Sequence, residues 1–556
     1  MRILKTFYIL TTTALISSCG LDQMANKYQT AEFITTPETL EAHGGEVELS
    51  LDANFAEKYF AKQATVDFTP VLVYDGGETA FKTIKIQGEE ATGGEATIFN
   101  ATGGNFKYND AIPYSEKMMN STLELRATAK LKDNEKVLGP INIANGVIST
   151  SMRVQNTESL ADKNHEYEHE TILEQKATIY FLVNQSNIRA TEKSNQEIKS
   201  LKAFAKKGYK THSITIISYA SPEGTVNTND NVSDNRMKST VNYTKRLLQS
   251  LQVDGAKNKA LYTENSVGED WKGFEYLITS SKIKDRKKIN KIISSIPDVE
   301  IREQQIRDLS EIYDAIADNV LPQLRKATII LRSYEPKKTD ENIAALSTTE
   351  PEQLDLNELL FSATLTDNKI SRTKIYNKAV ELHNDWRGYN NIACMHLAAG
   401  DLDQATIFLN KAEKLQNKTE HDILTNKGII AARRGDLKEA QRLFDQAKTP
   451  EINQAILDIR QGEYEKAARF FKNSKTHNGV LAQLMNGKNN VRCNEKTSAC
   501  HYLNAIAAAR SNSNESAIEN LAKAINLDGT YKDEAVRDLE FIKLRNNSSF
   551  IEVTKE

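Results

Sequence analysis

The sequence predicts a multidomain protein with an N-terminal β-sandwich, a central α/β domain and a C-terminal α-solenoid. Three observations predict this fold class. Residues 31–155 contain short segments of alternating apolar and polar residues, separated by glycine-rich turns. Residues 177–336 alternate between apolar strand-like segments and helical patterns. Residues 350–545 are helical in pattern and repeat a motif that begins Gly-Asp-Leu.

The N-terminus has the pattern of an export signal. A basic start is followed by a short apolar run that ends in residues 15–20, LISSCG. The run is too short to span a bilayer, and small residues before a cut site are typical of a secretory signal. With a cysteine at that site, residues 1–18 resemble a bacterial lipoprotein signal peptide. The resemblance implies that Cys19 is acylated and that residues 19–30 form a polar tether. An ordinary signal peptide with a chance cysteine is the alternative.

The residues after Cys19 favour sorting to the outer membrane. Gly20 stands where an aspartate would resemble an inner-membrane retention signal, so the outer membrane is expected. Asp22 is the single acid in the next few positions, which does not resemble the acidic run that sends some lipoproteins to the cell surface. The periplasmic face is therefore favoured, with surface exposure left open. More than one acyl chain gives stable membrane anchoring.

Composition excludes some partners and gives little sign of catalysis. The formal net charge of -3 offers no basic surface for nucleic acid. The charged connector predicted at residues 156–176 contains His165-Glu166-Tyr167-Glu168-His169, which fits the zinc motif H-E-x-x-H. A zinc protease needs that motif on a buried helix with a third ligand downstream, and this segment has few apolar residues. We therefore expect no enzyme, no metal and no cofactor, with a zinc hydrolase as a remote alternative.

The central domain carries a second resemblance. Residues 219–224, YASPEG, are followed by Asn229, Ser233 and Arg236, and Ser233 is predicted to be a helix N-cap. These residues and their spacing resemble the peptidoglycan-associating OmpA-like domain, over residues 177–336. A helical insertion is expected at about 269–322. After it, Arg325 resembles one of the family's paired arginines.

One departure from this family bears on binding. The family's ligand-binding aspartate, which pairs with the ammonium of diaminopimelate, is Ser221 here, whereas its carboxylate-binding arginine is kept as Arg236. A hydroxyl cannot replace a charge-assisted hydrogen bond of about 1.5–3 kcal/mol. Glu223 is a candidate for the missing charge. The resemblance thus implies peptidoglycan as a candidate partner and a candidate ligand set of Ser221, Glu223, Asn229, Arg236 and Arg325.

The C-terminal motif recurs at residues 400–405 (GDLDQA) and 435–440 (GDLKEA), with a looser copy at 462–467 (GEYEKA). The first two copies are 35 residues apart (400 to 435), close to the tetratricopeptide period of about 34. This resemblance to tetratricopeptide (TPR) repeats implies a superhelix with a concave protein-binding groove. Asn390, Asn391 and Asn426 occupy positions that often face the groove, and capping or solvent contact is the alternative.

The remaining features complete the domain plan. Residues 337–349 are expected to be a linker and residues 546–556 a tail. Cys394 lies in a helical pattern and is expected to be a small buried residue. Cys493 and Cys500 are a disulfide candidate, because they enclose a polar loop in a compartment that permits oxidation.

These parts predict a function in the cell envelope. The leading hypothesis is a periplasmic scaffold lipoprotein, held in the outer membrane by its lipid, that binds protein partners of an envelope complex through its TPR array. In this hypothesis the OmpA-like domain lies towards the cell wall. The alternative is a lipoprotein whose main task is to bind peptidoglycan. The sequence does not name the protein partner or the oligomeric state.

Overall fold

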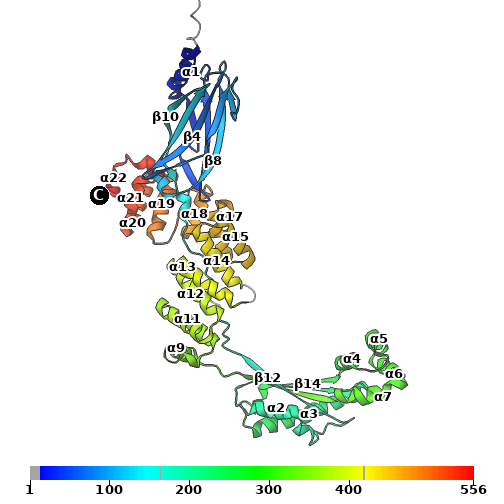
Figure 1. Cartoon of the computed structure of the whole chain (residues 1–556). Helices are drawn as coiled ribbons and strands as arrows, with labels where there is room; N and C mark the ends of the chain where they lie inside the picture. Colours follow the sequence, from blue (N-terminus) through cyan, green and yellow to red (C-terminus); the bar gives the residue numbers. More distant parts are fainter. Residues whose placement is uncertain (1–12, 163–164, 417–419, 556) are drawn as a thin grey trace, which may run out of the picture. The chain divides into compact units, whose positions relative to one another are not determined.

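The computed structural model describes residues 13–162, 165–416 and 420–555 (Figure 1). The chain forms two compact units, one from residues 1–164 and 366–556 and the other from residues 165–365. The predicted β-rich N-terminal region and helical C-terminal repeats are both confirmed, and they belong to the same unit. Residues 1–12 of the predicted signal peptide, and the side chain of the predicted lipidation site Cys19, lie outside the described residues.

The β-rich region consists of two sheets that share one core. Apolar residues alternate along each long strand, so each sheet buries one face, and Leu49 and Phe55 of one sheet pack in the same cluster as Val66, Phe68 and Leu125 of the other. The first sheet has the order β1-β3-β2-β11 with β8 paired to β3, and the second has the order β10-β9-β4-β6-β7 with β5 paired to β4. The strands are β1 (Glu32–Thr36), β2 (Leu40–His43), β3 (Glu46–Phe55), β4 (Ala64–Tyr74), β5 (Gly77–Ala80), β6 (Ile84–Gly88), β7 (Ala96–Ile98), β8 (Gly104–Pro113), β9 (Ser121–Leu131), β10 (Asn134–Asn145) and β11 (Val147–Ile148).

The prediction of a polar tether at residues 19–30 is wrong. Helix α1 (Thr13–Tyr28) includes most of this range and packs on β9 and β10. Its apolar residues Leu21, Met24 and Tyr28 are spaced three and four residues apart, so they share one helix face, and all three are buried in the core of the β-rich region. The few apolar residues among polar ones gave the range a tether-like composition, but their spacing is helical.

The second unit is built on a four-stranded sheet with the order β12-β15-β13-β14. Strands β13 and β14 are parallel, and β15 is antiparallel to both of its neighbours, β12 and β13. Apolar residues of the sheet form one core with helices α2 and α3. The elements are β12 (Ile172–Tyr180), α2 (Gln196–Ala205), β13 (Thr211–Ala220), α3 (Val226–Ser250), β14 (Tyr262–Glu269) and β15 (Lys326–Tyr334), with α4 (Trp271–Ser280), α5 (Arg286–Ser295), α6 (Val299–Arg307), α7 (Ser310–Asn319) and α8 (Leu321–Leu324) inserted before the last strand.

Three sequence-based expectations need correction here. Ser233 is not a helix N-cap, because α3 begins earlier at the cap Thr225, and the Ser233 hydroxyl is buried against Ser218. Residues 337–349 are not a linker but contain helix α9 (Asp340–Thr349), which has Thr339 as its N-cap. Helix α9 and α10 (Leu356–Ser362) belong to the second unit, so the repeats begin after residue 365 and not at residue 350.

The repeats are a series of antiparallel helix pairs. Gly400 and Gly435 end first helices in the left-handed conformation, with φ of 81° and 86°. The side chains of Asp401 and Asp436 then cap the second helices, as the repeated motif predicts. The helices are α11 (Lys369–His383), α12 (Trp386–Ala399), α13 (Leu402–Lys414), α14 (His421–Arg434), α15 (Leu437–Ala447), α16 (Glu451–Arg460), α17 (Tyr464–Phe470), α18 (His477–Met485), α19 (Ser498–Arg510), α20 (Asn514–Leu527), α21 (Tyr531–Arg537) and α22 (Ser548–Thr554). We refer to α11–α22 as the array.

The predicted tail at 546–556 is also wrong, because α22 buries Phe550 in the core of the last helices. At this C-terminal end the array packs on the β-rich region. His43 Nδ1 lies 3.0 Å from the Tyr464 hydroxyl. Around Gly146 there is no room for a side chain, since an added Cβ would lie 2.7 Å from Leu539. The β-rich region therefore has a fixed position on the array.

Candidate functional site

One face of the array already binds a peptide, and that peptide belongs to the same chain. Residues 153–162, here called the groove segment, follow the last elements of the β-rich region and form neither helix nor sheet. The segment contacts α18 at Gln155, α16 at Ser159, and α14 and α12 at Ala161. It therefore runs along the array from its C-terminal part towards its N-terminal part.

Asparagine side chains hold the backbone of this segment. Asn478 Oδ1 accepts from the Gln155 N–H at 2.8 Å, and its Nδ2 donates to the Gln155 carbonyl at 2.8 Å. Asn453 makes the same pair of bonds to Ser159, at 2.6 and 2.9 Å. Asn426 makes them to Ala161, at 3.1 and 3.2 Å. Each amide satisfies both polar groups of one residue, so binding depends on backbone and not on side-chain identity.

The structure places the three predicted groove residues in this ladder or beside it. Asn390 Nδ2 donates to the Ala161 carbonyl at 2.6 Å. Asn426 also donates to Asn390 Oδ1 at 2.9 Å. Asn391 is buried beside them, and its Oδ1 accepts from Asn390 at 3.3 Å. The side chains of Asn390 and Asn426 therefore face the groove, where they contact the chain itself.

One side chain of the groove segment is bound specifically by the array. Glu158 has a side chain that is 1 % exposed, and its Oε2 accepts from Arg433 Nη2 at 2.7 Å. Arg460 Nη2 lies 3.6 Å from the other carboxylate oxygen. Burial lowers the pKa of Arg460, while the charge of Glu158 opposes that effect. An acidic residue at this point of the peptide therefore neutralises the guanidinium of Arg433 and lies close to that of Arg460.

The start of the groove segment is fixed by a second charged cluster. The Arg153 guanidinium lies 2.9 Å from Asp538, 2.7 Å from Glu534 and 4.3 Å from the Tyr502 ring centre. His477 Nε2 lies 2.8 Å from the Arg153 carbonyl oxygen. Charge, hydrogen bonding and ring contact thus hold the point at which the chain enters the groove.

Sequence reasoning missed Asn453, Asn478 and Glu158, although a signal for the asparagines exists. Asn426, Asn453 and Asn478 each precede a left-handed glycine by nine residues (426 to 435, 453 to 462, 478 to 487). Glu158 carries no such signal, because its arginine partners come from a region 275 or more residues away.

The predicted ligand loop of the second unit is internally paired. Arg325 binds Glu223 with two hydrogen bonds of 2.8 and 2.9 Å. The Ser221 hydroxyl donates to the same carboxylate at 2.6 Å. Glu223 therefore brings its carboxylate to Ser221. The charge that Glu223 brings is already neutralised by Arg325.

Arg236 is buried, with 1 % of its surface exposed. It donates to three backbone carbonyls, those of Gln185, Tyr219 and Leu182, at 2.9–3.1 Å. Burial, together with the nearby charge of Arg325, lowers the pKa of Arg236 to about 10. In this arrangement the guanidinium holds the loops together and has little surface with which to meet a ligand.

Asn229 connects the loop to the inserted helices. Its Nδ2 donates to Glu269 Oε1 at 2.7 Å, and Trp271 Nε1 donates to the other oxygen at 2.8 Å. Beside Glu269 lies Glu303 of α6, which is 3 % exposed. Burial, together with the charge of Glu269, raises the pKa of Glu303 to about 7. Asn229 thus has a structural partner at the junction of sheet and insertion.

The H-E-x-x-H segment does not adopt the conformation that zinc binding by this motif needs. Residues 165–169 are not helical, and the rings of His165 and His169 both contact Phe361, with centroids 5.3 and 4.9 Å apart. His169 Nε2 lies 3.1 Å from Asp340. In a helix the two imidazoles would lie one turn apart on one face, but here both pack around an aromatic ring. That the chain is not an enzyme stays a prediction.

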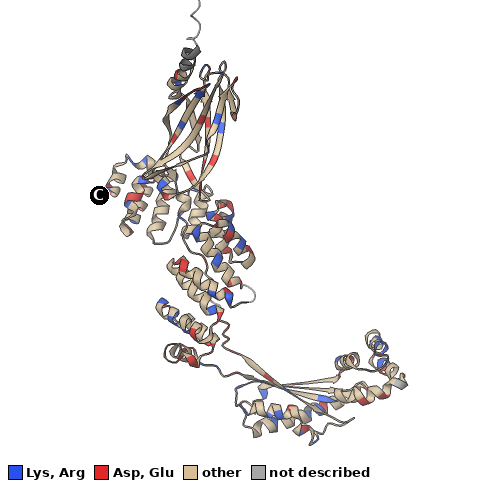
Figure 2. Ribbon diagram, in the orientation of Figure 1, with Lys and Arg blue, Asp and Glu red and all other residues tan. Residues whose placement is uncertain are grey.

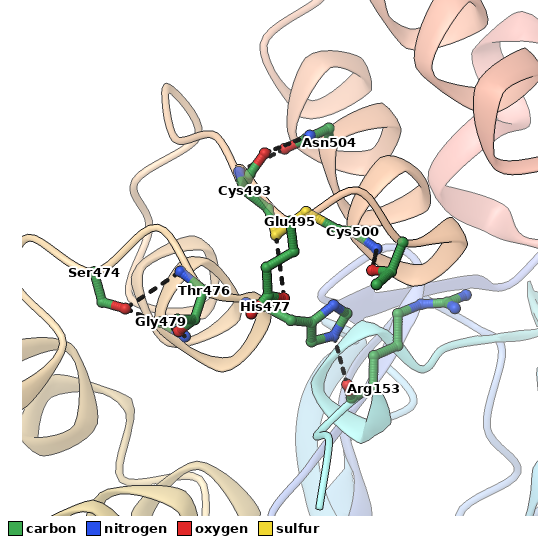
Figure 3. The surroundings of a disulfide bond; sticks show 10 residues. Arg153, Ser474, Thr476, His477, Gly479, Cys493, Glu495, Cys500 and Asn504 are labelled. Carbon is green, nitrogen blue, oxygen red and sulfur yellow. Dashed lines mark hydrogen bonds between the residues drawn. A yellow bond between two sulfur atoms is a disulfide. The ribbon is translucent and has the colours of Figure 1, made fainter. Parts of the chain in front are cut away.

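The disulfide candidate forms in the structure. Cys493 and Cys500 are joined, with Cα atoms 5.6 Å apart (Figure 3). Asn504 of α19 holds the backbone of Cys493 with bonds of 2.8 and 3.0 Å, in the same two-bond manner as the groove asparagines. Cys394 is buried in α12, where burial raises the pKa of its thiol.

Comparisons with known proteins add little. No protein-family model matches the sequence, and no curated protein matches it. Among solved structures, the APC/C hetero-tetramer Cut9-Hcn1 is similar at 13% identity and a TM-score of 0.25, over 59% of this chain and 73% of that chain. Salmonella alpha-2-macroglobulin reacted with methylamine is similar at 12% identity and a TM-score of 0.13, over 83% of this chain and 27% of that chain. TM-scores this low do not establish a shared fold with either protein.

Proposed function

We propose that this chain is a lipid-anchored scaffold of the bacterial outer membrane, in which the array clamps the chain's own groove segment. The asparagine ladder is the observation that carries this proposal. It uses the groove, the usual peptide-binding surface of such repeats, to fix the chain itself. Protein partners then bind outside the occupied groove.

Chain connectivity shows where the second unit is attached to the first. The β-rich region packs at the C-terminal end of the array, and the groove segment leaves the array at Ala161, beside α12 and α14. The second unit is inserted there, and the chain returns into α11. Both covalent links to the second unit therefore start from the N-terminal part of the array.

Membrane attachment rests on the sequence of residues 15–20. None of the described helices is long and apolar enough to cross a membrane. Acylation at Cys19 supplies the anchor in this proposal. In the same proposal, the resemblance of residues 177–336 to OmpA-like domains directs the second unit towards the cell wall.

The scaffold proposal is tested on the intact lipoprotein in its native envelope. A photoreactive amino acid is placed at exposed apolar positions on the array, Ile407 and Phe470, which are 46% and 44% exposed. Exposed Asn410 on α13 serves as the matched control. We expect cross-linking to one envelope protein from at least one apolar position and none from the control. Isolation of the lipoprotein without any protein in stoichiometric amount would overturn the scaffold role.

A second candidate function, peptidoglycan binding, is favoured by the position of Glu223. Its carboxylate lies at Ser221, but Arg325 neutralises it, so weak binding is expected. Sedimentation of the full chain with sacculi tests this. Ser221→Asp adds a charge that can meet an ammonium, and it should raise binding about tenfold, or about 1.4 kcal/mol. Full sedimentation of the unaltered chain, lost in Glu223→Gln, would make wall binding the main function.

A further inference from the structure

The anchoring cysteine is joined to the β-rich region without a tether. Leu21, Met24 and Tyr28 of α1 are 4%, 1% and 0% exposed, and the Tyr28 hydroxyl donates to the Leu125 carbonyl at 2.8 Å. Gly20 is thus the one residue between Cys19 and a side chain of the core. Two residues span at most about 7 Å when fully extended. An acylated Cys19 would hold this core within that distance of its attachment.

The contacts of Gly20 identify which end of the β-rich region lies next to Cys19. A Cβ added to Gly20 would lie 3.2 Å from Leu131 and 3.7 Å from Ala61. Leu131 ends β9 and pairs with Ala64 at the start of β4. At their other ends these two strands pair Tyr74 with Ser121. Ten residues of strand separate the two ends, or about 33 Å.

The near end includes residues 56–63 and 131–135, and its exposed charges are of both signs. Glu57, Lys58 and Lys62 lie in one loop, where Lys62 pairs with Glu89 and Glu90. Lys132 and Asp133 lie in the other turn. Lys27 of α1 donates to the Lys58 carbonyl at 3.0 Å, which fixes the helix to this end. Figure 2 shows acidic and basic residues interspersed over the β-rich region. A surface of mixed charge suits zwitterionic headgroups, which carry both signs.

We propose that this end of the β-rich region, residues 56–63 and 131–135, lies directly against the lipid headgroups of the membrane that holds Cys19. The proposal rests on the lipid anchor of the proposed function and adds the surface that faces the membrane. The β4–β5 turn at Asp75 and Gly76 then points away from the bilayer, because it lies at the opposite end of the same strands.

Fluorescence quenching tests the orientation. The full lipidated chain is placed in phosphatidylethanolamine vesicles that contain a lipid with a nitroxide headgroup. Single labels are introduced through Lys132→Cys at the near end and Asp75→Cys at the far end, both in exposed turns. We expect several-fold stronger quenching at position 132 than at position 75. Inserting ten Gly/Ser residues between Cys19 and Gly20 should remove the difference while membrane retention is kept.

Acylation is measured separately, by the incorporation of labelled fatty acid, which should be lost in Cys19→Ala. If the chain is acylated and membrane-bound but the two labels are quenched equally, the membrane-facing surface is wrong and the anchor stands. If no fatty acid is incorporated at Cys19, the anchor of the proposed function fails, and the orientation fails with it.

Discussion

Glu158 and Arg433 form an ion pair between residues 275 positions apart, with a hydrogen bond of 2.7 Å and side chains that are 1% and 7% exposed. The pair joins the groove segment to the array. It shows that the segment is bound as a ligand would be, through a buried charge as well as through its backbone.

We predict that breaking this pair loosens the groove segment. Glu158→Ala leaves two arginines with an uncompensated buried charge, which costs about 3–5 kcal/mol. Urea unfolding of the first unit should show the loss, and protease should cut residues 153–162 faster. The matched control is Glu465→Ala, which removes an exposed pair with Arg469, worth at most about 1 kcal/mol. Equal effects of the two changes would contradict the reading of Glu158 as a bound anchor.

The asparagine ladder makes a second prediction. Asn453→Leu keeps the size of the side chain but removes both bonds to Ser159. The free energy of unfolding should fall by about 1–3 kcal/mol, because polar groups of a packed segment lose their partners. Hydrogen exchange should identify the Ser159 amide as newly exposed. Asn410→Leu, on an exposed face of α13, is the control, and a similar loss there would show that the effect is not specific to the groove.

Much of the fold could be predicted because the spacing of apolar residues and of helix-end residues along the sequence determines it locally. Alternation over residues 121–131 predicts a half-buried strand, and the repeated glycine and aspartate at 400–401 and 435–436 predict helix ends. The groove segment could not be predicted in this way. It has no periodic pattern, and Glu158 is buried only because distant arginines neutralise it.

In the candidate sites, too, local pattern could be predicted from the sequence and tertiary contacts could not. Sequence reasoning found Asn390 and Asn426 from their repeat positions, but their occupant is fixed by tertiary contacts. For the second unit it assigned Arg236 a ligand role, whereas three backbone carbonyls hold that guanidinium. Two of these carbonyls lie on the loop after β12 and one on β13, so no local residue spacing encodes their approach.

His477 gives a pH dependence to the first unit. Burial lowers the pKa of His477, so the folded state binds a proton less readily than the unfolded chain. Its Nδ1 is buried without a hydrogen-bond partner, and protonation would place an unpaired N–H there. Stability should be complete above the unfolded pKa of about 6.5 and fall as the pH drops below it. Thermal unfolding between pH 8 and 5 measures this, and His477→Gln should reduce the slope. An unchanged slope in the variant would contradict the assignment.

Glu303 should give the stability of the second unit the opposite pH dependence. Burial, aided by the charge of Glu269, raises the pKa of Glu303 to about 7, so the folded state holds a proton that the unfolded chain, with a pKa of about 4.3, releases. Stability contributed by the protonated group is complete below pH 4.3 and is lost as the pH rises towards 7. Glu303→Gln imitates the protonated form and should flatten this part of the profile. Glu300→Gln, on the exposed face of the same helix, is the matched control. Because α6 carries Glu303 and β14 carries Glu269, the loss above pH 6 should appear first as hydrogen exchange in the inserted helices. Exchange that rises first in the sheet would contradict this account.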